Sequence, residues 1–347
     1  MIPINGYVIS SSRAITFLAL KLGGLEHYPG VSTALGLLFT AAIFTFIGTS
    51  PLILRGAALL PLAVALVPSD VEVFVVPLYT FWFAGLALFC LMLWQPDDRS
   101  RLPGRIAVAL ICGLSNPVVI PLAGVAVGRA AFTKARHEAL IALAMVLAAA
   151  AQLWVVRGNP GTSAIPTLPD AVLVMARFLG YPLLLGFTNE PPAAWVCVAA
   201  AVHATLLVAL LVPRESRSRR LALVGLFLFG AWTSIVRCQP PTLMHPAFAG
   251  PRYFFFPFIF LNWLWLDALL SAKTALARVA PVAVGCLILS SAARNFNRRH
   301  QHLAWNSAVH ELSLRGHGSL PIHYDGSIER HWVLKLAPCG NRLCKVQ

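Results

Sequence analysis

Residues 252–271 read RYFFFPFIFLNWLWLDALLS, and this stretch decides the class of fold. Between Arg252 and Asp267 it carries no charged side chain. It is about as long as the ~20 residues that a helix needs to cross a bilayer. Apolar and polar side chains do not alternate in it as in a barrel strand, and a segment in lipid must satisfy its own backbone hydrogen bonds. The stretch therefore predicts a membrane-spanning α-helix.

Similar apolar runs occur along most of the chain, at 32–48, 51–67, 74–95, 138–156, 194–212, 221–237 and 276–292. Of the 347 residues, 58% are apolar and 12% are charged, against about 25% charged in soluble domains, and the mean hydropathy is +0.74. This composition excludes a water-soluble globule. We predict an all-α integral membrane protein with about eight transmembrane helices in residues 32–292.

Two further segments are apolar but interrupted. The segment 104–130 contains Gly113-Leu114-Ser115-Asn116-Pro117. Because proline lacks a backbone donor and disfavours helix at the preceding residue, we expect a break there and a re-entrant hairpin. The segment 170–187 carries Arg177 and is split by Gly180-Tyr181-Pro182, so we expect an interfacial or re-entrant helix.

Lysine and arginine in the short loops predict the orientation. If 104–130 turns back, one side receives thirteen of them and the other receives three, Arg157, Arg237 and Arg252. The positive-inside rule then places the first side in the cytoplasm and both chain ends outside.

The formal charge of +14 does not point to a nucleic-acid partner, because no basic stripe interleaved with aromatic residues is present.

The two ends are expected outside the bilayer. Residues 1–31 form an extracytoplasmic or interfacial segment, and residues 293–347 form a small α/β tail domain with one or two short strands. Cys339 and Cys344 lie five residues apart in this tail, and a disulfide is permitted there if the tail is outside the cytoplasm. The six tail histidines lack metal-ligand spacing, so no metal site is predicted.

Two groups of residues are candidates for chemistry on the outer face. Asp70 and Glu72 fall in a turn between two predicted spans, where they could accept a proton or bind a divalent metal, or simply face solvent. Arg252 and Tyr253 precede the aromatic span. The planar guanidinium suits a lipid-linked phosphate, although an interfacial anchor has the same sequence.

The remaining acidic residues near the predicted cytoplasmic side have a simpler interpretation. Asp97, Asp98, Glu138 and Glu215 are expected to be surface partners of the arginines around them. Asp267 is expected to form a solvated pair near Lys273.

Several short motifs together resemble bacterial membrane glycosyltransferases of the GT-C type. They are Gly6-Tyr7 with Arg13-Ala14-Ile15, Tyr28-Pro29, Val67-Pro68 with Glu72-Val73-Phe74 and Trp82, Gly113 to Pro117, Gln152, Arg252-Tyr253-Phe254, and Trp332-Val333-Leu334-Lys335-Leu336. The order of these pieces covers most of the chain. Such proteins usually begin with a cytoplasmic N-terminus, one span and an outer loop bearing a catalytic acid, and the resemblance here starts after that part.

The resemblance implies an enzyme of a bacterial cytoplasmic (inner) membrane that transfers a sugar from a polyprenyl-phosphate carrier to an acceptor on the extracytoplasmic face. In that interpretation Glu72 or Asp70 activates the acceptor hydroxyl, and Arg252 with Tyr253 binds the donor phosphate. Membrane lipid and the lipid-linked sugar are the expected partners, and the sequence leaves a metal cofactor open. The alternatives are a non-enzymatic lipid or sugar transporter or flippase, and an inactive truncated relative.

Overall fold

The computed structural model describes residues 8–67, 76–96, 98–158, 166–238, 241, 244–246, 250–295, 304–324, 331–339 and 342–345, and from residue 321 onward only the backbone is described. The chain divides into two compact units. Unit 1 comprises residues 1–14 and 36–297, and unit 2 comprises residues 15–35 and 298–347. Residues 15–35 are thus grouped with the tail, and the predicted domain boundaries stay predictions.

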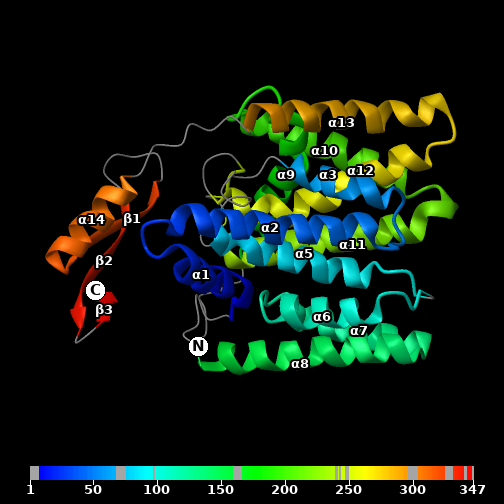
Figure 1. The fold of residues 1–347 in the computed structure, drawn as a ribbon. Helices are drawn as coiled ribbons and strands as arrows, with labels where there is room; N and C mark the ends of the chain where they lie inside the picture. The colour runs from blue at the N-terminus through cyan, green and yellow to red at the C-terminus, as the bar shows by residue number, and fades with distance from the viewer. Residues whose placement is uncertain are drawn as a thin grey trace. The chain divides into compact units, whose positions relative to one another are not determined.

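The described residues form thirteen α-helices, with short 3₁₀ turns (η) and three strands (Figure 1). The first part of the chain contains α1 (Ser10–Gly23), α2 (Tyr28–Thr49), η1 (Ala57–Leu59), α3 (Leu60–Ala65), η2 (Pro77–Tyr79), α5 (Thr80–Met92), α6 (Leu102–Gly113), α7 (Val119–Thr133) and α8 (Arg136–Gly158). The rest contains α9 (Leu168–Leu184), α10 (Ala193–Leu210), α11 (Arg214–Arg237), η4 (Pro251–Phe254), α12 (Phe255–Ser271), α13 (Ala275–Asn295), α14 (Trp305–Arg315), β1 (Gly318–Tyr324), β2 (His331–Cys339) and β3 (Arg342–Lys345).

Six described helices are long and apolar enough to cross a membrane: α2, α8, α10, α11, α12 with η4, and α13. These correspond to six of the eight predicted runs, and the protein is accordingly a multi-pass membrane protein. The prediction of a span at 51–67 is wrong, because that segment contains only η1 and the six-residue α3. Gly56 adopts a left-handed φ of 67° before η1, which interrupts a continuous helix. The described part of the run 74–95 forms η2 and α5.

Helices α5 and α12 form the centre of unit 1, and most of their side chains are buried. Their aromatic rings pack edge to face, with Phe89 contacting Phe256 and Phe260 at centroid distances of 5.2 and 5.0 Å. Such pairs contribute about 0.5–1.5 kcal/mol beyond the burial of their area. The aromatic stretch that identified the fold is therefore a protein-facing core helix as well as a span.

The break predicted within 104–130 is present between α6 and α7, and a re-entrant position of this pair in the membrane stays a prediction. Arg105 near the start of α6 and Arg129 near the end of α7 both contact Glu138, so the two helices turn back on each other, and Gly113 at the turn lies against Ala148. With 12 and 15 residues, the two helices are about 18 and 22 Å long, shorter than the ~30 Å hydrocarbon core. Asn116 holds the tip by donating from Nδ2 to the Phe81 carbonyl at 2.7 Å.

Unit 2 combines α14 with a three-stranded antiparallel sheet in the order β1-β2-β3. Its described core is formed by Val309, Leu312 and Leu320, with Leu25 and Trp305 packed against them. The register of β1 on β2 shifts between Pro321 and His323, where the proline cannot donate to the ladder. The sequence predicted one or two strands here, and the described part of the tail contains three.

Candidate functional site

Contacts between the loops define two ends of unit 1. At one, which we call the basic end, Gly56 lies against Leu270, Arg101 donates to the Thr49 carbonyl at 3.0 Å, and Arg129 donates to the Met92 carbonyl at 2.8 Å. Arg220 bonds there both to Asp267 and to the Leu210 carbonyl. The loops that carry the thirteen basic residues of the sequence argument therefore meet at this end.

The other end of unit 1 carries Arg252, and we call it the Arg252 end. Gly250, with a left-handed φ of 68°, turns the chain, and Pro251 starts the short η4 helix that contains Arg252 and leads into α12. The Ser234 hydroxyl of α11 donates to the Tyr253 carbonyl at 2.8 Å. Phe254 is buried with its ring 4.7 Å from that of Phe178. The two residues that follow Arg252 are thus both held by contacts with other helices.

The Arg252 side chain lies between two tyrosines. Its Nη1 donates to the Tyr79 hydroxyl at 3.3 Å, and the guanidinium carbon lies 6.0 Å from the Tyr79 ring centroid and 5.3 Å from that of Tyr253. Among the described residues no carboxylate forms an ion pair with it. Because arginine stays protonated, this half-buried cation has aromatic faces rather than an anion beside it.

Other cationic and aromatic groups lie at the same end. Arg237 interacts electrostatically with Tyr253, and Arg177 donates to the Met244 carbonyl at 2.6 Å. The His245 ring meets Tyr181 edge to face at 4.9 Å. Burial lowers the pKa of His245 to about 4, with Arg177 acting in the same direction, so this ring is neutral at pH 7.

The predicted acidic residues Asp70 and Glu72 lie outside the described residues. The described chain resumes at Val76, three residues before Tyr79. Their predicted role in one reaction with Arg252 therefore stays a prediction. Tyr79 itself was missed by the sequence argument, since a tyrosine at the start of an apolar helix is equally typical of an interfacial anchor.

Trp82 adds a donor near this site. Its ring packs against those of Phe255 and Phe256, at centroid distances of 6.1 and 5.0 Å. Its indole Nε1 is buried and finds no acceptor among the described residues. A buried N–H group without a partner is costly, so an oxygen supplied from elsewhere would stabilise it.

The acidic residues at the basic end are structural, and two sequence interpretations of them are wrong. Glu138 is buried, not a surface residue, and bonds Arg105 at 2.7 Å and Arg129 at 2.9 Å. Asp267 is also buried and pairs with Arg219 and Arg220 at 3.3 and 3.2 Å, not with Lys273.

The pairing of Glu215 agrees with the sequence interpretation. This carboxylate bonds Lys273 at 2.8 Å, and both side chains are about three-quarters exposed, at 75% and 76%. Glu215 is therefore a solvated surface partner.

The two tail cysteines lie on adjacent strands. In the β2–β3 ladder, Cys339 lies opposite Arg342 and Cys344 lies opposite Ala337. They occupy positions two residues apart along the ladder, and their side chains are outside the described part, so the disulfide stays a prediction. Within the described residues no group of three or more His, Cys, Asp or Glu side chains gathers to hold a metal.

Comparisons with known proteins give no match for this chain. It matches no protein-family model, no curated protein and no solved structure. The functional argument therefore rests on the sequence motifs and on the geometry of the Arg252 end.

Proposed function

We propose that this protein is a membrane glycosyltransferase of the GT-C kind, which transfers a sugar from a polyprenyl-phosphate donor on the extracytoplasmic side. The observation that carries the proposal is Arg252, a half-buried cation held between Tyr79 and Tyr253 without a described carboxylate partner. A guanidinium in that setting suits a phosphate, to which it donates two parallel hydrogen bonds.

The orientation of unit 1 supports an outward-facing site. The basic end collects the lysines and arginines that the positive-inside rule assigns to the cytoplasm, which leaves the Arg252 end outside. Three strongly exposed tryptophans lie toward the Arg252 end, Trp154 near the end of α8, Trp195 at the start of α10 and Trp232 near the end of α11. Tryptophan is typical of the membrane–water interface, so Arg252 would lie near the depth of lipid phosphates.

The proposed reaction divides the work between two groups. Glu72, or Asp70, accepts the proton of the acceptor hydroxyl, and the acceptor oxygen bonds to the anomeric carbon of the donor sugar. The bond between that carbon and the phosphate oxygen breaks, and Arg252 stabilises the charge on the departing lipid phosphate. The phenol of Tyr79 and the indole N–H of Trp82 supply neutral donors beside it.

Binding of the donor phosphate tests Arg252. The full chain in nanodiscs would be titrated with undecaprenyl phosphate and with undecaprenol. We expect phosphate-dependent binding that weakens at least about tenfold, or ~1.4 kcal/mol, in Arg252→Lys, because lysine keeps the charge but loses the bidentate geometry. The matched control is Arg278→Lys, an exposed arginine at the start of α13. Equal binding by wild type and Arg252→Lys would contradict the assignment.

Transfer of a labelled sugar from polyprenyl-phosphate hexose tests the carboxylate. Glu72→Gln and Asp70→Asn should leave donor binding unchanged, and the variant that removes the base should lower turnover by about 10²–10⁴-fold. If lipid crosses the bilayer without any sugar transfer or donor hydrolysis, the transporter alternative is correct instead.

A further inference from the structure

Unit 2 contains an open pocket of about 440 Å³ between the start of α2 and the start of α14. Its lining is formed by Glu26, His27, Pro29, Gly30, Val31, Trp305 and Asn306. The volume is within the range of about 300–1,000 Å³ of small-molecule sites. All of these residues belong to one compact unit, so the pocket is internal to it.

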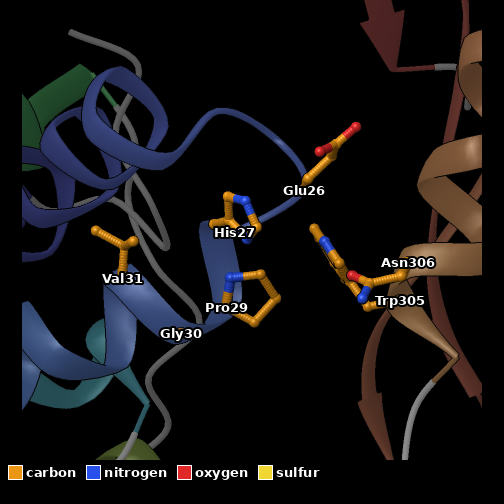
Figure 2. Close-up of a pocket in the computed structure, with 7 residues that line it drawn as sticks. All are labelled: Glu26, His27, Pro29, Gly30, Val31, Trp305 and Asn306. Atoms are coloured by element: carbon orange, nitrogen blue, oxygen red, sulfur yellow. The ribbon is translucent and has the colours of Figure 1, made fainter.

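The indole of Trp305 is fixed in place at this pocket. Its ring stacks on Tyr28 with centroids 5.9 Å apart and planes 29° apart, and its Nε1 donates to the Leu25 carbonyl at 2.9 Å. Figure 2 shows the ring across the opening from His27 and Pro29. An aromatic ring that is already held by a stack and a hydrogen bond offers its surface with little loss of conformational entropy.

Polar side chains surround this ring. Glu26, His27 and Asn306 are exposed, and Figure 2 shows them around the same opening as Trp305. A carboxylate accepts hydrogen bonds, an imidazole can donate and accept, and an amide offers two donors and an acceptor. This mixture matches a ligand whose groups both donate and accept, as hydroxyl groups do.

The charge of the lining argues against an anion. Glu26 is the one carboxylate among the lining residues, and neither lysine nor arginine lines the pocket. We propose that this pocket binds a neutral saccharide, with a sugar face on Trp305 and its hydroxyl groups bonded to Glu26, His27 and Asn306. Binding does not depend on the proposed transferase activity. A role for this pocket in holding the acceptor of a transfer reaction does rest on that proposed function.

A neighbouring pocket of about 430 Å³ helps to locate the sugar. It shares Glu26 but is otherwise lined by Gly23, Gly24, Leu25, Val309, Leu312 and Ser313. This second lining has no aromatic ring and one hydroxyl group, so it lacks the surface on which a sugar face would stack. The saccharide is therefore assigned to the pocket at Trp305.

Titration of the full chain with cellotriose, chitotriose and mannotriose tests the proposal. The protein would be placed in phosphatidylcholine nanodiscs, because detergents with sugar headgroups would compete. We expect at least one trisaccharide to bind, measured by calorimetry. Glu26→Ala and Asn306→Ala change exposed side chains and should each weaken binding at least fivefold. Trp305→Ala should abolish binding, and Trp305→Phe should retain part of it.

The matched control is Trp195→Ala, an exposed tryptophan of α10 in unit 1, which should bind as wild type does. No binding of any of the three sugars up to about 10 mM would overturn the proposal. Binding that is unchanged in Glu26→Ala and Asn306→Ala would also overturn it. So would tighter binding of inorganic phosphate in Glu26→Gln, because that result identifies an anion site. Since no lipid donor is added, failure here leaves the Arg252 proposal standing, and the reverse also holds.

Discussion

Trp265 of α12 donates a 2.8 Å hydrogen bond from its indole Nε1 to Nε2 of His203 on α10. Because Nε2 accepts, the ring proton is on Nδ1, which donates to the Leu179 carbonyl of α9 at 2.6 Å. His203 is fully buried. A histidine inside a membrane helix is a functional candidate by default, but here both nitrogens are used to join three helices.

Replacement of His203 by phenylalanine should therefore destabilise the protein without a direct effect on chemistry. It removes the acceptor of the Trp265 N–H and leaves that buried donor unpaired, at a cost of about 1–3 kcal/mol in the free energy of unfolding. His310→Ala, at an exposed position of α14, should stay within about 0.5 kcal/mol of wild type. Unfolding of the purified protein in denaturing detergent measures both, and equal stabilities would refute the structural role.

Glu138 should be far more important for stability than a surface carboxylate. Glu138→Gln would leave Arg105, which is fully buried, and Arg129, which is 13% exposed, without their anion. Breaking a buried pair from one side costs about 3–5 kcal/mol. Glu215→Gln is the matched control, because its partner Lys273 is 76% exposed, and it should cause no measurable change. A small effect at Glu138 would show that water reaches this cluster.

These acidic residues also show what the sequence could and could not predict. Local chemistry sufficed for the break at Asn116-Pro117, because proline acts on its own backbone neighbours. It did not suffice for Glu138 and Asp267, since their burial depends on which helices pack around them. Counting nearby arginines predicted that both carboxylates have cationic partners. It predicted neither which residues those partners are nor that the carboxylates are buried.

The same limit applies to spans and to the candidate site. The run 51–67 is as apolar as a true span, and the structure divides it because Gly56 turns the chain against Leu270, a contact with a distant helix. Arg252 was identified from residue type alone. Its contact with Tyr79 joins residues 173 positions apart, which no local pattern encodes.

Close packing of α9 on α10 should make Gly180 intolerant of a side chain. A Cβ atom at Gly180 would lie 2.5 Å from the Val196 carbonyl oxygen, a backbone atom that cannot move away alone. We expect Gly180→Ala to destabilise the protein by about 1–3 kcal/mol. Gly225→Ala in α11 has open space around its Cβ and should be neutral or stabilising by up to ~1 kcal/mol. Thermal unfolding compares the two, and similar melting temperatures would contradict this packing.

The orientation of unit 1 can be tested with single cysteines in a background that lacks the native ones. Arg217→Cys lies at the basic end and Glu190→Cys lies in the connection between α9 and α10, near Tyr181. An impermeant thiol reagent added to intact cells should label position 190 and not position 217, because the basic end is expected in the cytoplasm. Permeabilised cells should show labelling at both positions. Labelling of position 217 in intact cells would show that the orientation is the reverse of the predicted one.

His245 should make the folded protein sensitive to mild acid. Burial lowers its pKa from 6.5 to about 4, with Arg177 contributing and a backbone hydrogen bond to Asn189 opposing. As the pH falls from 6.5 to 4, the unfolded chain gains a proton at this ring and the folded chain does not. The unfolded state therefore binds more protons in this window, and the free energy of unfolding decreases as the pH falls.

His245→Phe keeps a ring against Tyr181 but cannot be protonated, so its melting temperature should fall less between pH 7 and 4 than that of wild type. His310→Ala should follow the wild-type curve, and parallel curves for His245→Phe and wild type would show that this ring is not a source of the acid sensitivity.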